Sequence, residues 1–265
     1  MAKTAPKGRN WTREQQLIAL RLYLRTAFGR LSQRNPEIIA LASLIGRTPS
    51  ALSMKACNFG SLDPTIQQKG LTGASEADKV LWNEYTANPT AITLEMEDAA
   101  ARLRIPDADV DVPLPPVLTA AETETQRLVR VRRVQSLFRQ SVLISYDSRC
   151  AVTGLALPEV LVASHIIPWK DSVERRADPT NGILLNALLD RAFDRGLISF
   201  DDQFRVMVSR SLKKAATNAG LACSLLEIEG RALMLPRRFA PDPVAIKHHR
   251  DRMFKGSNPA GARFS

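Results

Sequence analysis

Cysteine is scarce in this sequence, and the few cysteines present do not lie close together. Cys57, Cys150 and Cys223 form no C-x-x-C pair, so neither a disulfide framework nor a four-thiolate zinc site is supported. We therefore expect no structural zinc and a reducing cytosol. In such a protein Cys150 would pack as a small hydrophobic side chain.

The chain also lacks an apolar run of roughly 18 residues, the length that a membrane-spanning helix requires. Its first residues, MAKTAPKGRN, lead into a charged segment rather than into the apolar core of a secretory signal. These absences predict a soluble, cytoplasmic protein.

Acidic residues are too few to balance the basic ones. The 37 lysines and arginines exceed the 27 acidic residues and give a formal net charge of +10. Such an excess favours a polyanionic partner, because binding releases the counterions condensed on it, and nucleic acid is the first candidate. A merely soluble basic protein is the alternative, so the charge needs support from a motif.

The sequence is long enough for a substantial core. With 265 residues, 45% of them hydrophobic, it allows one large or two modest domains and argues against disorder throughout. A first helix is predicted from Trp11 to about Phe28, because Leu17, Leu20 and Leu24 recur on one face, and Thr12 is a candidate N-cap.

Two further helices follow with a short turn between them. The second runs from Pro36 to Ile45 and ends at Gly46, and the third begins at Thr48 and covers SALSMKACNF. A turn of two or three residues is helix-turn-helix spacing. The alternative is an ordinary helical hairpin that packs onto the first helix.

In the helix-turn-helix interpretation, the third helix is a recognition helix that exposes polar side chains to a DNA groove. Its candidate DNA-binding residues are Ser50, Ser53, Lys55 and Asn58. Lys55 would meet a phosphate, and Asn58 would read adenine.

The chain changes character after Asn88. The segment NPTAITLEMEDAAARLR is followed by IPDADVDVPLPP, whose acidic and proline-rich composition favours an interdomain linker. We place a helical DNA-recognition domain at residues 1–92, a linker at 93–118, a second domain at 119–255 and a disordered tail at 256–265.

The second domain is expected to begin with a helix from Thr119 to about Tyr146 and to close with one from Pro241 to Phe254. Between them, CAVTG is predicted as a strand and turn, VLVASHI as a strand, and LLNALLDRAFDR as a helix closed by Gly196. The order is ββα, and with the N-terminal helices it makes the fold class α+β.

Chemistry-bearing side chains gather in this ββα segment. His165 stands near the end of a predicted strand and can take a proton from water near neutral pH, given an ordinary pKa of about 6.5. Asp190 and Asp194 are four residues apart, so a helix projects both from one face, where they can reach one cation. Such oxygen ligands suit Mg²⁺ or Mn²⁺. Asn181 could orient the imidazole or coordinate the metal through its carbonyl oxygen.

Each of these residues also has a structural interpretation. His165 could be a hydrogen-bonded core histidine, Asn181 a turn residue, and the two aspartates solvated partners of Arg191 and Arg195. Arg191 and Arg195 could equally clamp the scissile phosphate. His248 and His249 are predicted to be surface residues. Together, the order and spacing of the motifs favour metal-assisted phosphodiester cleavage.

These motifs resemble the HNH endonuclease family, in the branch whose motifs read roughly A-H-I-x-P, N-G-L-x-L and H-x-x-F-D-R-G-L. The resemblance covers about residues 150–202 and implies a single-metal ββα nuclease. It implies that His165 is the general base and Asn181 the middle Asn of the motif. It also implies that Asp190 takes the place of the last His, and that Asp194 is the Asp of F-D-R-G.

Two positions depart from the family pattern. Ser164 stands where other branches have a metal-binding Asp before the first His, and Leu189 stands where relatives with A-L-H-D-R-A-F-D-R-G have a His. We favour Asp190 as the ligand, because it has the helical relation to Asp194 that Leu189 lacks. If the missing His were indispensable, the domain would be weakened or inactive.

The phrase MKACNFGSLDP resembles the N-terminal winged-helix-like domain found fused to nuclease domains in prokaryotic restriction proteins. The two resemblances together imply a DNA endonuclease of restriction or defence type with one Mg²⁺ or Mn²⁺ per site. A requirement for a modified base stays open. Double-stranded DNA is the expected partner, and cutting both strands would need two active sites and therefore a homodimer on DNA. The alternative is a DNA-binding regulator on a catalytically weakened nuclease scaffold. RNA as substrate is disfavoured by the helix-turn-helix.

Overall fold

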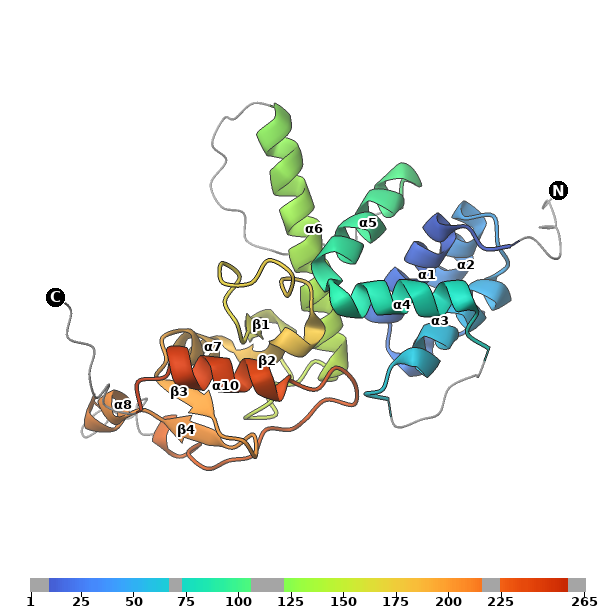
Figure 1. Cartoon of the computed structure of the whole chain (residues 1–265). Coiled ribbons are helices and arrows are strands. Elements are labelled where there is room, and N and C mark those ends of the chain that lie inside the picture. The colour runs from blue at the N-terminus through green and yellow to red at the C-terminus, as the bar shows by residue number, and fades with distance from the viewer. Residues whose placement is uncertain (1–9, 67–72, 106–121, 216–224, 257–265) are drawn as a thin grey trace. The chain divides into compact units, whose positions relative to one another are not determined.

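The computed structural model describes residues 10–66, 73–105, 122–215 and 225–256 (Figure 1). The chain divides into two compact units. The helical unit comprises Met1–Ile144 together with Val173–Asp178, and the mixed unit comprises Ser145–Ser172 and Pro179–Ser265. Among the described helices, none combines the length and the apolar character needed to cross a bilayer.

The helical unit contains six described α-helices and one short 3-10 turn. They are α1 (Arg13–Arg25), η1 (Phe28–Arg30), α2 (Pro36–Leu44), α3 (Pro49–Leu62), α4 (Glu76–Ala87), α5 (Pro89–Arg102) and α6 (Glu122–Ser145), of which the last extends to the boundary between the units.

Helix α1 forms the centre of this unit. Thr12 caps it as predicted, because its side chain accepts a hydrogen bond from the Gln15 backbone N–H, while the Gln15 Oε1 accepts one from the Thr12 backbone N–H. All residues from 16 to 24 are buried, since α1 packs against α3, α4 and α5. Because other helices cover α1 on several sides, its buried residues are not confined to one helix face.

The predicted helix-turn-helix order is present in α2 and α3. Asn35 caps α2, Gly46 in the turn has the left-handed φ of +66°, and Thr48 caps α3 by accepting from the Ala51 N–H. The described part of the helical unit holds no β-strand. The expectation of a wing therefore gains no support from residues 10–66 and 73–105.

The predicted linker differs from the structure in its first ten residues. Residues 93–102 belong to α5, whose Met96, Ala99 and Ala100 are buried because α5 packs on α1 and α4. Residues 106–118 of the linker and 257–265 of the predicted tail lie outside the described residues.

The short stretch Val173–Asp178, far from α1 to α5 in sequence, belongs to the helical unit. Thr90, near the start of α5, donates from its backbone N–H and its hydroxyl to the Glu174 carbonyl, at 3.2 and 2.9 Å. Its hydroxyl also accepts from the Ala177 N–H at 3.1 Å. Three hydrogen bonds at one buried threonine thus hold Val173–Asp178.

The mixed unit contains two small antiparallel sheets and three described α-helices. Its elements are η2 (Pro158–Val160), β1 (Leu161–His165), η3 (Pro179–Asn181), β2 (Gly182–Asn186), α7 (Ala187–Asp194), β3 (Ile198–Phe200), β4 (Val206–Val208), α8 (Arg210–Ala215) and α10 (Pro243–Arg252). Strand β1 pairs with β2 and β3 with β4. Helix α7 packs on β1, β2 and β3, and α10 packs on β3 (Figure 1).

The ββα order is present, but its strands differ from those predicted. CAVTG forms a turn, closed by hydrogen bonds from the Cys150 N–H to the Leu155 carbonyl and from the Gly154 N–H to the Cys150 carbonyl. The second strand is instead β2, and α7 begins only at Ala187, capped by the Asn186 side chain. Strand β2 was assigned to the helix because a short, fully buried apolar run carries no periodicity that separates strand from helix.

Candidate active site

His165 is the last residue of β1, where it stands opposite Gly182 of β2. Its side chain is half-buried. The Trp169 ring meets the imidazole edge-on, with centroids 5.6 Å apart and planes at 87°. This aromatic contact restrains the orientation of the imidazole ring at the end of the strand.

Asn181 is bonded to the loop that follows His165. Its Oδ1 accepts from the Ile167 N–H at 2.8 Å, and its Nδ2 donates to the Ile167 carbonyl at 3.1 Å. Its backbone carbonyl accepts from the Ile166 N–H at 2.9 Å. Asn181 is 1% exposed. These hydrogen bonds fix the backbone of Ile166 and Ile167, which follow His165. The expected role of Asn181 toward the imidazole or a metal stays a prediction.

Asp190 and Asp194 lie on α7, as the sequence predicts. Burial raises the pKa of Asp190, the nearby Ser164 hydroxyl lowers it, the charge of Asp194 raises it and that of Arg191 lowers it, with a net rise. The pKa of Asp194 is also raised by burial, against the lowering charges of Arg191 and Arg195, although Asp194 keeps much of its surface exposed. The two carboxylates are therefore close enough to repel each other.

The first turn of α7 faces β1 through Asp190 rather than through Leu189. Leu189 is 2% exposed and belongs to the core. Ser164 is buried on β1 and lies near enough to the Asp190 carboxyl group to lower its pKa. Its Oγ nevertheless makes no hydrogen bond of ordinary geometry to any residue that the structure describes. A partly dehydrated carboxylate thus lies beside the buried Ser164 hydroxyl, immediately before His165 in the sequence.

The carboxylates of Asp190 and Asp194 fit a hard divalent cation whose remaining ligands are water and substrate phosphate. The described residues include no group of three or more His, Cys, Asp or Glu side chains that could hold a metal ion. Mg²⁺ is commonly bound by one or two carboxylates and completes its shell with water and substrate phosphate. Asp190 and Asp194 would supply such a pair, and the Ser164 Oγ lies near Asp190.

Arg191 and Arg195 are exposed on the same helix as the carboxylates. Neither forms an ion pair with a residue that the structure describes, although their charges lower the pKa of Asp194. They are therefore available to an external anion.

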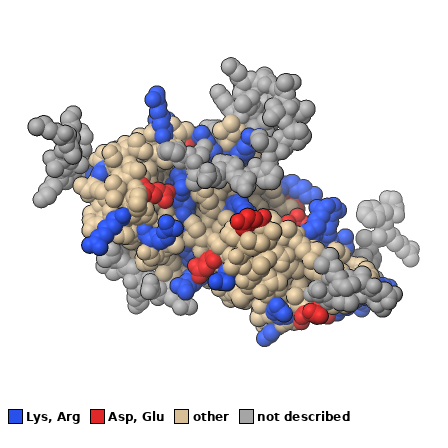
Figure 2. All heavy atoms as spheres, turned by 180° about the vertical axis from the view of Figure 1, so that it is seen from behind, with Lys and Arg blue, Asp and Glu red and all other residues tan. Residues whose placement is uncertain are grey.

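Figure 2 shows lysine and arginine side chains in separate groups across the visible surface, with acidic side chains among them. On the face shown, charge alone does not mark a DNA-binding surface.

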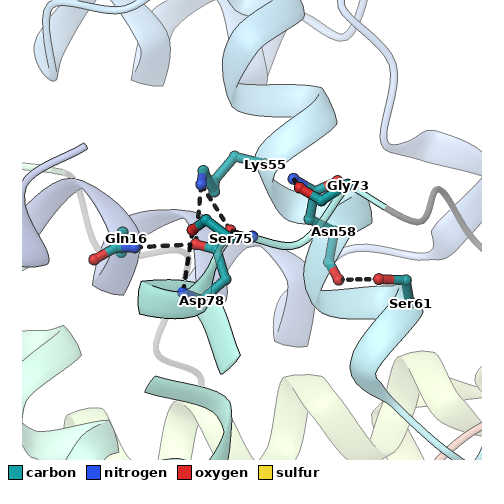
Figure 3. A network of polar contacts seen from close by, with 7 residues as sticks. All are labelled: Gln16, Lys55, Asn58, Ser61, Gly73, Ser75 and Asp78. Carbon is teal, nitrogen blue, oxygen red and sulfur yellow. Dashed lines mark hydrogen bonds and ion pairs between the residues drawn. The ribbon is translucent and has the colours of Figure 1, made fainter. Parts of the chain in front are cut away.

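The candidate DNA-binding residues of α3 have different environments, and two of them, Lys55 and Asn58, are drawn in Figure 3. Ser50 is exposed, and Asn58 is half-buried with its Nδ2 donating to the Gly73 carbonyl at 3.0 Å. Ser53 is buried and donates to the Leu31 carbonyl at 2.8 Å. Lys55 is also buried. The polar atoms of Ser53 and Lys55 thus bind other residues inside the helical unit. The prediction that both side chains are exposed to a DNA groove was wrong.

Lys55 binds the start of α4 through a buried carboxylate. Its Nζ donates to both oxygens of Asp78, at 2.9 and 2.8 Å, and Gln16 Nε2 donates to Asp78 at 3.0 Å (Figure 3). Asp78 also exchanges hydrogen bonds with Ser75, the N-cap of α4. Burial raises the pKa of Asp78, but the Lys55 and Ser75 bonds outweigh it and lower it overall. Lys55 is the one charged residue of α3, so this helix presents no cation to a groove.

His249, predicted to lie on the surface, is fully buried. Its Nε2 lies 3.0 Å from the Phe193 carbonyl oxygen, and its Nδ1 lies 2.9 Å from Ser199 Oγ. Its ring stacks on Phe193, with centroids 3.7 Å apart. The prediction was wrong because it relied on the basic residues next to His249, which indicate a solvated helix face. The partners that bury His249, Phe193 and Ser199, lie far away in sequence.

Cys150 is buried as predicted, and Asn186 Nδ2 lies 3.9 Å from its sulfur.

Comparison with known families identifies one segment of the chain. Residues 150–201 match the family model described as HNH endonuclease, and the match spans β1, β2, α7 and β3. It supports nuclease activity with DNA as substrate, and HNH nucleases generally use a divalent metal ion. No curated protein matches the chain closely enough for a comparison.

Proposed function

We propose that this chain, whose residues 150–201 match the HNH endonuclease model, is a metal-dependent DNA endonuclease that hydrolyses phosphodiester bonds. The observation that carries the proposal is the position of Asp190. Its carboxyl group lies beside Ser164, the residue before His165, while Leu189 points into the core. Asp190 thus lies beside the strand that ends at His165, and the proposal is that the carboxylate and the imidazole serve one site.

Asp190 and Asp194 would hold one divalent cation, Mg²⁺ or Mn²⁺. Their raised pKa values have burial as the main cause, and the charge of Asp194 further raises the pKa of Asp190. A cation would relieve both effects. When bound, it would supply charge neutralisation at the nonbridging and leaving oxygens of the scissile phosphate.

His165 would act as the general base. A ring nitrogen of His165 would accept a proton from the attacking water, and the half-buried side chain keeps part of its surface open to solvent. Trp169 restrains the ring, and Asn181 holds the backbone that follows it. Arg191 and Arg195, exposed and without described ion-pair partners, would contact the DNA phosphates.

In the helical unit, Ser50 and Asn58 remain as proposed DNA contacts, because both have some exposed surface. Ser53 and Lys55 are left out, because their polar atoms are used inside the unit. The combination of a helix-turn-helix arrangement with an HNH segment supports a role in restriction or defence. Cutting of both DNA strands would require a homodimer on the substrate. Digestion of plasmids with and without adenine or cytosine methylation tests whether a modified base is required.

A DNA-binding regulator on a weakened nuclease scaffold is the second candidate. Two residues favour it: Ser164 and Leu189 occupy positions where a ligating Asp and His are found in the family pattern. Both candidates predict salt-sensitive DNA binding, so binding alone does not separate them.

Nicking of a supercoiled plasmid separates the two candidates. The enzyme predicts relaxed and then linear product with Mg²⁺ or Mn²⁺, none with EDTA, and loss of cutting in His165→Ala. His248→Gln is the matched control, since His248 lies on α10 outside the proposed site. Tight DNA binding with no metal-dependent product from the wild-type protein supports the regulator and contradicts the enzyme.

A further inference from the structure

The end of α7 is held by a buried histidine from α10. His249 is 0% exposed, and both of its ring nitrogens have partners inside the mixed unit. Nε2 lies 3.0 Å from the carbonyl oxygen of Phe193, and Nδ1 lies 2.9 Å from Ser199 Oγ. Phe193 belongs to the last turn of α7, and its carbonyl oxygen also accepts from the Gly196 N–H at 2.8 Å, so His249 is an additional partner at this helix end.

These partners determine the tautomer of His249. A carbonyl oxygen can only accept, so Nε2 carries the proton and donates to Phe193. Nδ1 is then the acceptor, and the Ser199 hydroxyl donates to it. Burial lowers the pKa of His249 to about 4, so the ring is neutral near pH 7 with both polar atoms satisfied.

Ring packing fixes Phe193 from two sides. The His249 ring lies almost parallel to the Phe193 ring, at 9° and 3.7 Å between centroids, and Phe200 contacts Phe193 at 5.5 Å. Phe193 is fully buried. A rotation of α7 about its own axis would have to break this stack and expose the phenyl ring, which is costly for a large apolar side chain.

The segment after α10 closes on the same end of α7. Gly196 has a φ of +66°, and a Cβ atom there would lie 1.9 Å from the Met253 carbonyl oxygen. The Lys255 N–H donates to the Gly196 carbonyl at 2.9 Å. Only glycine fits this left-handed, crowded position, so the turn that ends α7 is locked by backbone contact as well as by His249.

We propose that His249 is a positioning residue for the nuclease site, which fixes the rotation of α7 and thereby aims Asp190 and Asp194 at the metal. The inference rests on the proposed function. Asp194 follows Phe193 directly, and Asp190 stands one helical turn before Asp194, so the bond to the Phe193 carbonyl and the ring stack act on the carboxylates through the helix itself. His249 touches neither substrate nor metal and acts only by orienting side chains that do.

Four variants test this inference in the full chain. His249→Phe keeps the aromatic stack and removes both hydrogen bonds, whereas His249→Gln returns an N–H donor for the Phe193 carbonyl. Ser199→Ala removes only the donor to Nδ1. His248→Gln, at the neighbouring residue, is the matched control. Mn²⁺ affinity is measured from the electron paramagnetic resonance signal of the free ion, kcat and KM from plasmid nicking, and folding from circular dichroism.

The expected result for His249→Phe is Mn²⁺ affinity and kcat both reduced by about tenfold or more, the size seen when a residue supporting a metal ligand is lost, with KM for DNA near the wild-type value. His249→Gln should recover part of the loss, and His248→Gln should match the wild type. A folded His249→Phe protein with wild-type Mn²⁺ affinity and kcat contradicts the inference, even if it melts at a lower temperature.

Two further outcomes are also decisive. If His249→Phe does not fold, Ser199→Ala decides: a folded protein with weakened Mn²⁺ binding supports the positioning role, and wild-type binding and kcat contradict it. If the wild-type protein itself neither binds Mn²⁺ nor nicks DNA, the proposed function fails and the inference fails with it. That pattern differs from a functional wild type with an unaffected His249 variant.

Discussion

The Asp190 carboxyl group lies beside Ser164, whose hydroxyl helps to set the pKa of the aspartate. Ser164 is buried on β1 immediately before His165, and its Oγ has no hydrogen bond of ordinary geometry within the described part of the chain. An unsatisfied buried hydroxyl is costly. A cation between this hydroxyl and the carboxylate would satisfy both groups.

Replacement of Asp190 by asparagine should weaken Mn²⁺ binding by about tenfold or more, because it removes a negative charge while keeping the shape of the side chain. Mn²⁺ titration monitored by electron paramagnetic resonance measures this. The melting temperature should stay the same or rise, since Asp190 is partly dehydrated and repelled by Asp194 without metal. Wild-type Mn²⁺ affinity in a folded Asp190→Asn protein would rule out Asp190 as a ligand.

Leu189→His tests the competing ligand position. The family pattern would make this change a restoration, but Leu189 is 2% exposed in the core, so a histidine there buries a polar ring. We expect lower stability and no gain in nicking rate. A gain in nicking without loss of stability would show that position 189, and not Asp190, is the ligand position.

Lys55→Met should destabilise the helical unit without weakening DNA binding. It leaves the fully buried Asp78 without its cation, and loss of one partner from a buried ion pair typically costs about 3–5 kcal/mol. Lys79→Met is the matched control. The Lys79–Glu76 pair is exposed, so its loss should cost no more than about 1 kcal/mol. Denaturant unfolding and fluorescence anisotropy with duplex DNA measure the two effects. Weaker DNA binding by a folded Lys55→Met protein would show that Lys55 contributes to DNA binding.

Thr90→Val should loosen the segment Val173–Asp178. Valine has the same shape but removes the hydroxyl that donates to Glu174 and accepts from Ala177, at a cost of about 1–3 kcal/mol. Trypsin should then cleave faster at Arg175 or Arg176. Thr93→Val is the control from the same helix, because the buried Thr93 hydroxyl has no hydrogen-bond partner among the described residues. Equal trypsin cleavage rates in the two variants would argue against a holding role for Thr90.

His249 predicts how stability depends on pH. Its pKa is lowered from 6.5 to about 4 by burial, so between these values the unfolded chain binds more protons than the folded one. The free energy of unfolding should therefore be fully present above about pH 6.5 and fall as the pH drops toward 4, by roughly 3 kcal/mol at about 1.4 kcal/mol per unit.

Comparison with His249→Gln isolates this contribution. Asp190 and Asp194 have raised pKa values and act in the opposite direction, but they are the same in both proteins. Urea unfolding at pH 7 and pH 5 should show a smaller pH dependence in the variant. If the free energy of unfolding depended equally on pH in both proteins, the lowered pKa of His249 would be contradicted.

Local patterns explain why much of the architecture follows from the sequence. The Thr12 cap, the α2–α3 turn at Gly46 and the i, i+4 carboxylates of α7 depend on neighbours within a few residues. The errors have the opposite character. Lys55 pairs with a residue 23 positions away and His249 with one 56 positions away, so only tertiary packing decides that they are buried. Strand β2 was missed because its residues are buried on both faces and do not alternate.

The proposed nuclease activity depends most directly on His165 as the base that activates water. The decisive measurement is the single-turnover nicking rate of a plasmid by wild-type and His165→Ala protein at saturating Mg²⁺ and saturating protein, with DNA binding measured in parallel. We predict a rate reduced by about a hundredfold or more, the usual loss when a general base is removed, with DNA affinity unchanged. A folded His165→Ala protein that nicks within about twofold of the wild-type rate would contradict the proposed role of His165.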